Sequence, residues 1–141
     1  MNTTRGFLLS WTGIVGVLLV LAVNAVAAEP AALSREDRRG GVTVTATPLP
    51  PVTAEGPLRV KVVLDTHSVS LDDLAFERIV ALRAADGSEV SPTAIEEATG
   101  SGHHREAIVV LAAITNPVVI VVKNVAGVTE RSFSWDLSST R

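Results

Sequence analysis

Two apolar runs in the second half of the chain constrain its fold more than any other feature. Residues 107–114 (AIVVLAAI) and 118–122 (VVIVV) are apolar at every position, and a Thr-Asn-Pro turn at 115–117 separates them. Short runs of this kind, rich in β-branched residues and bounded by turn signals, are typical of strands that are buried on both faces. We therefore expect two central strands, each covered on two sides.

Alternation of apolar and polar residues marks further strands. It runs through residues 42–47 (VTVTAT) and 58–65 (LRVKVVLD), as expected for strands that bury one face. The pattern is clearest near the end of the chain, where one face carries Arg131, Phe133, Trp135 and Leu137 and the other carries only Glu, Ser and Asp. Phe133 and Trp135 are therefore expected in the core.

Turn signals separate these strands at short intervals. A proline-rich cluster at 48–51 ends the first strand, the Asp-Gly pair at 86–87 predicts a hairpin from 79–83 to 89–91, and 99–102 (TGSG) has the composition of a loop. The pattern predicts an all-β fold, an immunoglobulin-like antiparallel β-sandwich of about seven strands. The Cys…Trp…Cys pattern of true immunoglobulin domains is absent.

One short helical turn is expected between two of the strands. Ser70 and Asp73 have the spacing of a helix-capping pair, and apolar residues follow at helical spacing. A longer helix from Leu71 to Leu82 would give an α+β fold instead. Ile79 and Val80 favour strand, so we prefer the all-β interpretation.

The first 28 residues predict a signal peptide. Arg5 precedes an apolar run at 7–28, and the small residues at its end suit cleavage after Ala27 or Ala28. The run is also long enough to cross a bilayer, so an inner-membrane anchor formed by residues 7–28 is the alternative.

The remaining chain divides into three parts. Residues 29–40 mix charges with small residues and predict a flexible linker, 41–137 the β-sandwich domain, and 138–141 a tail. We expect an exported, periplasmic protein that has no membrane contact once it is processed.

Charge and cysteine content exclude several classes of function. The chain has no cysteine, so disulfides, thiolate metal sites and lipid-modified cysteines are ruled out. Its formal net charge is −3, and the single charge in the first 28 residues is basic, so the rest is more acidic still. This balance argues against nucleic acid or anionic lipid as a partner.

The three histidines carry the main hypothesis about a site. In a strand Asp65 and His67 share a face, and His103 and His104 could join them if both lay in the loop after TGSG. Neutral imidazoles with one carboxylate suit Zn²⁺ or Cu²⁺, although the spacing matches no specific metal motif. The alternative is that these histidines hydrogen-bond to nearby groups and clasp loops together.

Two other kinds of site have less support. Calcium could use Asp65, Asp72 and Asp73, but the loop lacks the spacing of a calcium-binding loop. Asp65, His67 and Ser68 supply the residue types of a hydrolase triad, yet adjacent strand residues point apart and no nucleophile elbow is present. A hydrolase therefore ranks last.

Four blocks of the sequence resemble a group of small exported bacterial proteins of uncharacterised function. The four segments are 41–49 (GVTVTATPL), 62–71 (VVLDTHSVSL), 102–106 (GHHRE) and 127–137 (GVTERSFSWDL). In that group L-D-T-H-S, G-G-H-H-R and R-x-F-x-W blocks occur in this order, and they correspond to the last three of these segments. This chain departs from the pattern at Ser101, where glycine is usual, and at Ile95, where tryptophan is common.

The resemblance implies that His67, His103, His104 and Arg105 belong to one arrangement, and it carries over no activity. We therefore expect a non-enzymatic exported module that binds a transition metal through its histidine blocks. The alternative is a structural or protein-interaction domain, with a partner the sequence does not identify, in which the histidines clasp loops.

Overall fold

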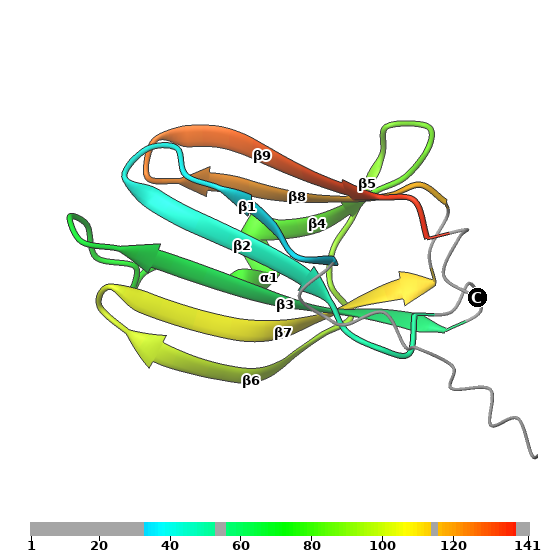
Figure 1. The fold of residues 1–141 in the computed structure, drawn as a ribbon, viewed down its shortest axis with the longest axis horizontal. Helices are drawn as coiled ribbons and strands as arrows, with labels where there is room; N and C mark the ends of the chain where they lie inside the picture. Colours follow the sequence, from blue (N-terminus) through cyan, green and yellow to red (C-terminus); the bar gives the residue numbers. More distant parts are fainter. Residues whose placement is uncertain (1–32, 53–55, 114–115, 138–141) are drawn as a thin grey trace, which may run out of the picture.

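The computed structural model describes residues 33–52, 56–113 and 116–137. These residues form two antiparallel sheets with very little helix (Figure 1). One sheet has the strand order β1-β2-β3-β7-β6, and the other has the order β5-β4-β8-β9. The predicted all-β, sandwich-like architecture is confirmed at this level.

The elements follow one another in short connections. Their bounds are β1 Arg35–Asp37, β2 Val42–Pro48, β3 Pro57–Thr66, α1 Phe76–Ile79, β4 Val80–Arg83, β5 Glu89–Val90, β6 Ala94–Ser101, β7 His104–Ala113, β8 Val118–Val125 and β9 Val128–Trp135.

One apolar core lies between the sheets, and the alternating strands supply it. In β2 every second residue is fully buried, and β3 continues the same parity from Leu58 to Leu64. β9 buries Phe133 and Trp135, whose rings stack with centroids 6.5 Å apart. The sequence prediction that both aromatic residues belong to the core is confirmed.

The two apolar runs form central strands, as predicted, and they lie in different sheets. β7 lies between β3 and β6, and β8 lies between β4 and β9. Ile108, Val110 and Val121 are 8%, 9% and 0% exposed, although none of them belongs to the core cluster between the sheets. Their burial must therefore come from side chains on the outer faces.

Long ion-paired side chains cross those outer faces. Arg59 on β3 reaches over β7 to Glu96 on β6, with 2.6 Å between Nη2 and Oε2. Arg83 on β4 likewise reaches over β8 to Glu130 on β9, at 2.5 Å. The aliphatic part of an arginine can cover apolar surface while its charged end stays in water. Both central strands are thus covered on their second face by charged residues.

The start of the described chain is fastened to β9. The indole Nε1 of Trp135 donates to the carbonyl of Leu33. The fully buried Arg131 donates to the carboxylate of Asp37 at 3.2 Å and to the carbonyl of Arg39 at 2.6 Å. We call residues 33–39 the N-terminal strap, because they join an edge strand of one sheet to an edge strand of the other.

The strap corrects the expectation of a flexible linker for residues 33–40, and residues 29–32 of that predicted linker lie outside the described residues. Residues 35–37 form β1, which pairs with β2 from Arg35↔Ala46 to Asp37↔Val44. Three consecutive charged residues give no alternation, so the sequence pattern could not reveal this strand. The side chains of Glu36 and Asp37 form ion pairs instead of packing into the core.

Two local predictions also need correction. The helical turn is present, but it lies at Phe76–Ile79 with Ala75 as its N-cap. Ser70 instead accepts from the backbone N–H of Asp72 and donates to that residue's carboxylate, so it shapes a turn before the helix. The longer helix from Leu71 to Leu82 does not form.

The expected TGSG loop is also different. Residues 99–101 continue strand β6, and only the turn at 102–103 connects it to β7. Gly100 is needed at its position, since its φ is +83° and a Cβ there would lie 2.3 Å from the carbonyl oxygen of His104. Ser101 has no such requirement, because it lies in the strand opposite His104.

The predicted signal peptide and the tail at 138–141 lie outside the described residues. Within the part of the chain that the structure does describe, no helix is long and apolar enough to cross a membrane.

Candidate functional site

The histidine blocks meet at one end of the molecule. The turn at 102–103 lies beside the loop at 67–75, at the opposite end from the start of β1 and the end of β9 (Figure 1). We call these two loops the histidine end.

Backbone hydrogen bonds join the two loops directly. The N–H of Thr66 donates to the carbonyl of His103 at 2.9 Å, and the N–H of Leu71 donates to the carbonyl of Gly102 at 2.8 Å. In return the N–H of Gly102 donates to Oδ1 of Asp72 at 2.7 Å. Backbone polar groups in irregular segments need such partners, so these bonds fix the shape of both loops.

Arg105 is the central side chain of this arrangement. Its Nη1 donates to the carbonyls of Leu71, Asp72 and Leu74, at 3.0 Å and 3.2 Å for the first two. Its guanidinium also lies over the ring of Phe76, 5.3 Å from the centroid. A charged donor stabilises carbonyl groups that no regular element satisfies. Arg105 therefore holds the segment that carries the chain from one sheet to the other.

The histidines themselves make separate contacts. His104 begins β7 opposite Asp65 on β3, and its Nδ1 lies 2.5 Å from Oδ1 of that carboxylate. His103 lies in the turn, with Nδ1 3.1 Å from the carbonyl oxygen of Val69. His67 is exposed, and it has no hydrogen-bond partner among the described residues.

The four predicted metal ligands are thus only partly brought together. The structure pairs His104 with Asp65, whereas His103 turns to a backbone carbonyl and His67 stands apart. In residues 33–52, 56–113 and 116–137 there is no group of three or more His, Asp or Glu side chains placed to hold a metal ion. Binding of Zn²⁺ or Cu²⁺ stays a prediction from the sequence.

The electrostatics follow from these contacts. The pKa of the Asp72 carboxyl is lowered, mainly by the hydrogen bond from the Gly102 N–H and then by that from Ser70. The pKa of His104 is raised above 6.5, mainly by its hydrogen bond to Asp65. Both shifts favour the charged form of the side chain in the folded protein.

The raised pKa of His104 predicts how stability depends on pH. Its contribution should be fully present below pH 6.5 and should be lost as the pH rises through the higher pKa of the folded state. We expect the wild-type thermal midpoint to decline over that range. His104→Ala and Asp65→Asn should each flatten the decline, as measured by scanning calorimetry at constant ionic strength. An unchanged decline in both variants would contradict the prediction.

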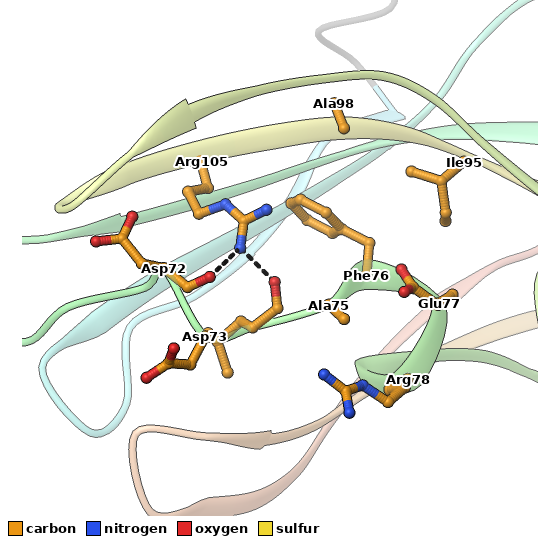
Figure 2. Close-up of a pocket in the computed structure, with 10 residues that line it drawn as sticks. Asp72, Asp73, Ala75, Phe76, Glu77, Arg78, Ile95, Ala98 and Arg105 are labelled. Carbon is orange, nitrogen blue, oxygen red and sulfur yellow. Dashed lines mark hydrogen bonds between the residues drawn. The ribbon is translucent and has the colours of Figure 1, made fainter.

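A pocket of about 400 Å³ lies next to Arg105 (Figure 2). It opens between the segment around α1 and the edge strand β6. The residues that line it are Asp72, Asp73, Leu74, Ala75, Phe76, Glu77, Arg78, Ile95, Ala98 and Arg105.

Comparison with known proteins identifies no relative that has this arrangement. No protein-family model, curated protein or solved structure matches the chain.

The sequence pattern did not predict that Arg105 holds the loop at 67–75. Only the resemblance grouped it with the histidines, and Phe76 and Asp72 were not connected with it at all. A signal was nevertheless present, because Arg105 has the same parity as Ala107 and Val109, which face the core. An arginine at an inward position must bond to something inside the protein.

Proposed function

We propose that this chain is an exported, non-enzymatic module of immunoglobulin-like type that binds a protein partner through its histidine end. The observation that carries the proposal is the set of hydrogen bonds between the loops at 67–75 and 102–103, which fixes the backbone that carries the exposed side chains. Metal binding is the other function that the sequence predicts, and the separate contacts of the histidines give it less support.

The strand order supports the immunoglobulin-like type. The order β2-β3-β7-β6 corresponds to strands A-B-E-D of an immunoglobulin domain, and β4-β8-β9 corresponds to C-F-G. β5 then lies beside strand C at the edge of the second sheet. In this correspondence the loop at 67–75 belongs to the B–C connection and the turn at 102–103 to the D–E connection.

The exposed residues of the histidine end support recognition. His67 and His103 are exposed, and Val69, whose carbonyl contacts the His103 ring, is 36% exposed, so the end presents both polar and apolar groups. Loops that are positioned by a rigid sandwich are common binding elements. Because the backbone bonds already order both loops, a partner would lose little affinity to loop ordering.

Two further observations support the non-enzymatic and exported parts of the proposal. The Ser68 hydroxyl lies 3.5 Å from that of Thr66, and its N–H donates to the same oxygen, so Ser68 belongs to a turn. A serine nucleophile would instead need a hydrogen bond to a base. Export rests on the sequence of residues 1–28, which has the charge and apolar pattern of a signal peptide.

Photo-cross-linking in the native host tests the proposal. A photoreactive amino acid at position 67 should give a discrete cross-linked product with one partner protein. The same amino acid in place of Ala85 is the matched control, because Ala85 is also exposed but lies in the β4–β5 turn at the opposite end. Equal products from both positions, or none from position 67, would contradict binding through the histidine end.

A further inference from the structure

The pocket beside α1 is lined by Arg105, and two nitrogens of this side chain take no part in joining the loops of the histidine end. Only Nη1 of Arg105 is used to hold the carbonyls of the neighbouring loop. Its Nε and Nη2 have no hydrogen-bond partner among the described residues. Every buried side-chain nitrogen and oxygen in that part of the chain does have a partner. The two remaining nitrogens must therefore be open to solvent, and Arg105 lines the pocket.

The edge of the guanidinium formed by Nε and Nη2 is therefore free to bind a ligand. The N–H groups of Nε and Nη2 lie side by side and point the same way, which matches the two oxygens of a carboxylate. The bonds from Nη1 and the ring of Phe76 beneath the guanidinium hold that edge in place (Figure 2). A prepositioned donor pair loses less conformational entropy when it binds an anion.

A bulge in β6 shapes the other wall of the pocket. Glu96 pairs with Ile108 and Thr99 pairs with Glu106, so two residues of β6 lie opposite one residue of β7. One of those two, Glu97, has a φ of +50°, which is uncommon for a residue other than glycine. The other, Ala98, lines the pocket with Ile95. Bulges often occur beside functional sites, where they redirect the chain.

The charges around the pocket restrict the kind of anion. Asp72, Asp73 and Glu77 line it together with Arg78 and Arg105. Three acids facing two arginines would repel a doubly charged phosphate, whereas one carboxylate can pair with one guanidinium edge. Ile95, which is half-buried, and Ala98, which is exposed, offer apolar surface for the body of the ligand, whereas Phe76 is 2% exposed and lies in the core behind the guanidinium.

We propose that the pocket between α1 and β6 binds a small organic monocarboxylate with an apolar body, with Nε and Nη2 of Arg105 as the carboxylate-binding pair. A free amino-acid derivative and the carboxyl terminus of a peptide share this chemistry. The pocket volume is within the usual range for small-molecule sites. The proposal does not depend on partner binding at the histidine end.

Titration of the ¹⁵N-labelled protein with N-acetyl-L-leucine tests the proposal. The acid should cause saturable shifts in the backbone amide signals of residues 74–78 and 95–98, and N-acetyl-L-leucine amide should cause none, because it lacks the carboxylate. Inorganic phosphate should also fail to bind. A tetrapeptide that ends in leucine, compared with its amide, separates the two sources: a site for peptide termini should bind the tetrapeptide acid more tightly than N-acetyl-L-leucine, and a site for free small molecules should bind N-acetyl-L-leucine more tightly.

The variants are chosen so that the loops held by Arg105 stay intact. Ala98→Trp should fill the pocket and weaken binding at least about tenfold, equivalent to about 1.4 kcal/mol. Ala94→Trp is the control, since Ala94 is exposed on the same strand and does not line the pocket. The proposal is overturned if neither acid binds, if acid and amide bind alike, or if Ala98→Trp binds as tightly as Ala94→Trp.

Discussion

Replacing Trp135 with alanine should lower the free energy of unfolding by about 3–5 kcal/mol, the usual cost of removing a large aromatic side chain from a core. Trp135 is 2% exposed and stacks on Phe133, and its Nε1 donates to the carbonyl of Leu33. The substitution therefore removes core packing and one anchor of the N-terminal strap together. Urea unfolding followed by circular dichroism measures the change.

Two controls separate these contributions. Trp135→Phe keeps an aromatic ring but removes the indole donor, so the lost hydrogen bond should contribute about 1–3 kcal/mol because it leaves the Leu33 carbonyl without that partner. Ser134→Ala changes the exposed neighbour and should leave the urea midpoint within error. If Trp135→Ala also left the midpoint unchanged, the parity of β9 would be wrong.

The strands could be predicted because the pattern of apolar and polar residues along each strand follows the burial of its two faces. Alternation in β2, β3 and β9 placed the inward residues correctly, and the fully apolar runs identified both central strands. The short edge strands were harder to predict from the sequence. β1 consists of Arg, Glu and Asp, and Asp37 pairs with Arg131, 94 positions away, a contact that local periodicity does not contain.

In the candidate site too, some contacts could be predicted from the sequence and others could not. Asp65 and His104 could be grouped from the sequence, and they are direct neighbours across β3 and β7. The division of His103 and His104 between a turn and a strand depends on where β6 ends. β6 continues through Gly100, and Gly102, whose φ is also positive, lies in the two-residue turn, whereas glycine composition alone had suggested a longer loop.

For Arg131 the alternation predicted the correct face of β9 but did not predict the partners of the side chain. The alternation placed it on the face of Phe133 and Trp135, yet an arginine in that position does not by itself reveal its partners. They are Asp37, the carbonyl of Arg39 and the carbonyl of Val125. An inward charge in a sheet therefore predicts that some distant segment supplies a carboxylate and carbonyls. Here that segment is the N-terminal strap.

Replacing Arg131 with alanine should accordingly cost about 3–5 kcal/mol of unfolding free energy, because it removes a large, fully buried side chain together with its hydrogen bonds. The Arg131 side chain is 0% exposed and that of Asp37 is 19% exposed. Without the guanidinium, two carbonyls and part of a carboxylate lose their donor in a poorly hydrated position. The pKa of Asp37 should stay low, because its main cause is the hydrogen bond from Arg39.

The loss should also release the strap, and this distinguishes the proposed contact from a general loss of packing. Limited trypsin digestion should cleave Arg131→Ala after Arg35, Arg38 or Arg39 much faster than the wild type, before the rest of the domain is cut. Arg83→Ala is the matched control, since Arg83 is also an ion-paired arginine of the same sheet but its side chain is 29% exposed. Its cost should be smaller, because the acids that lose this partner, Glu89 and Glu130, are 27% and 34% exposed and can be hydrated. Equal costs in both variants, with no early cleavage near β1, would show that Arg131 does not hold the strap.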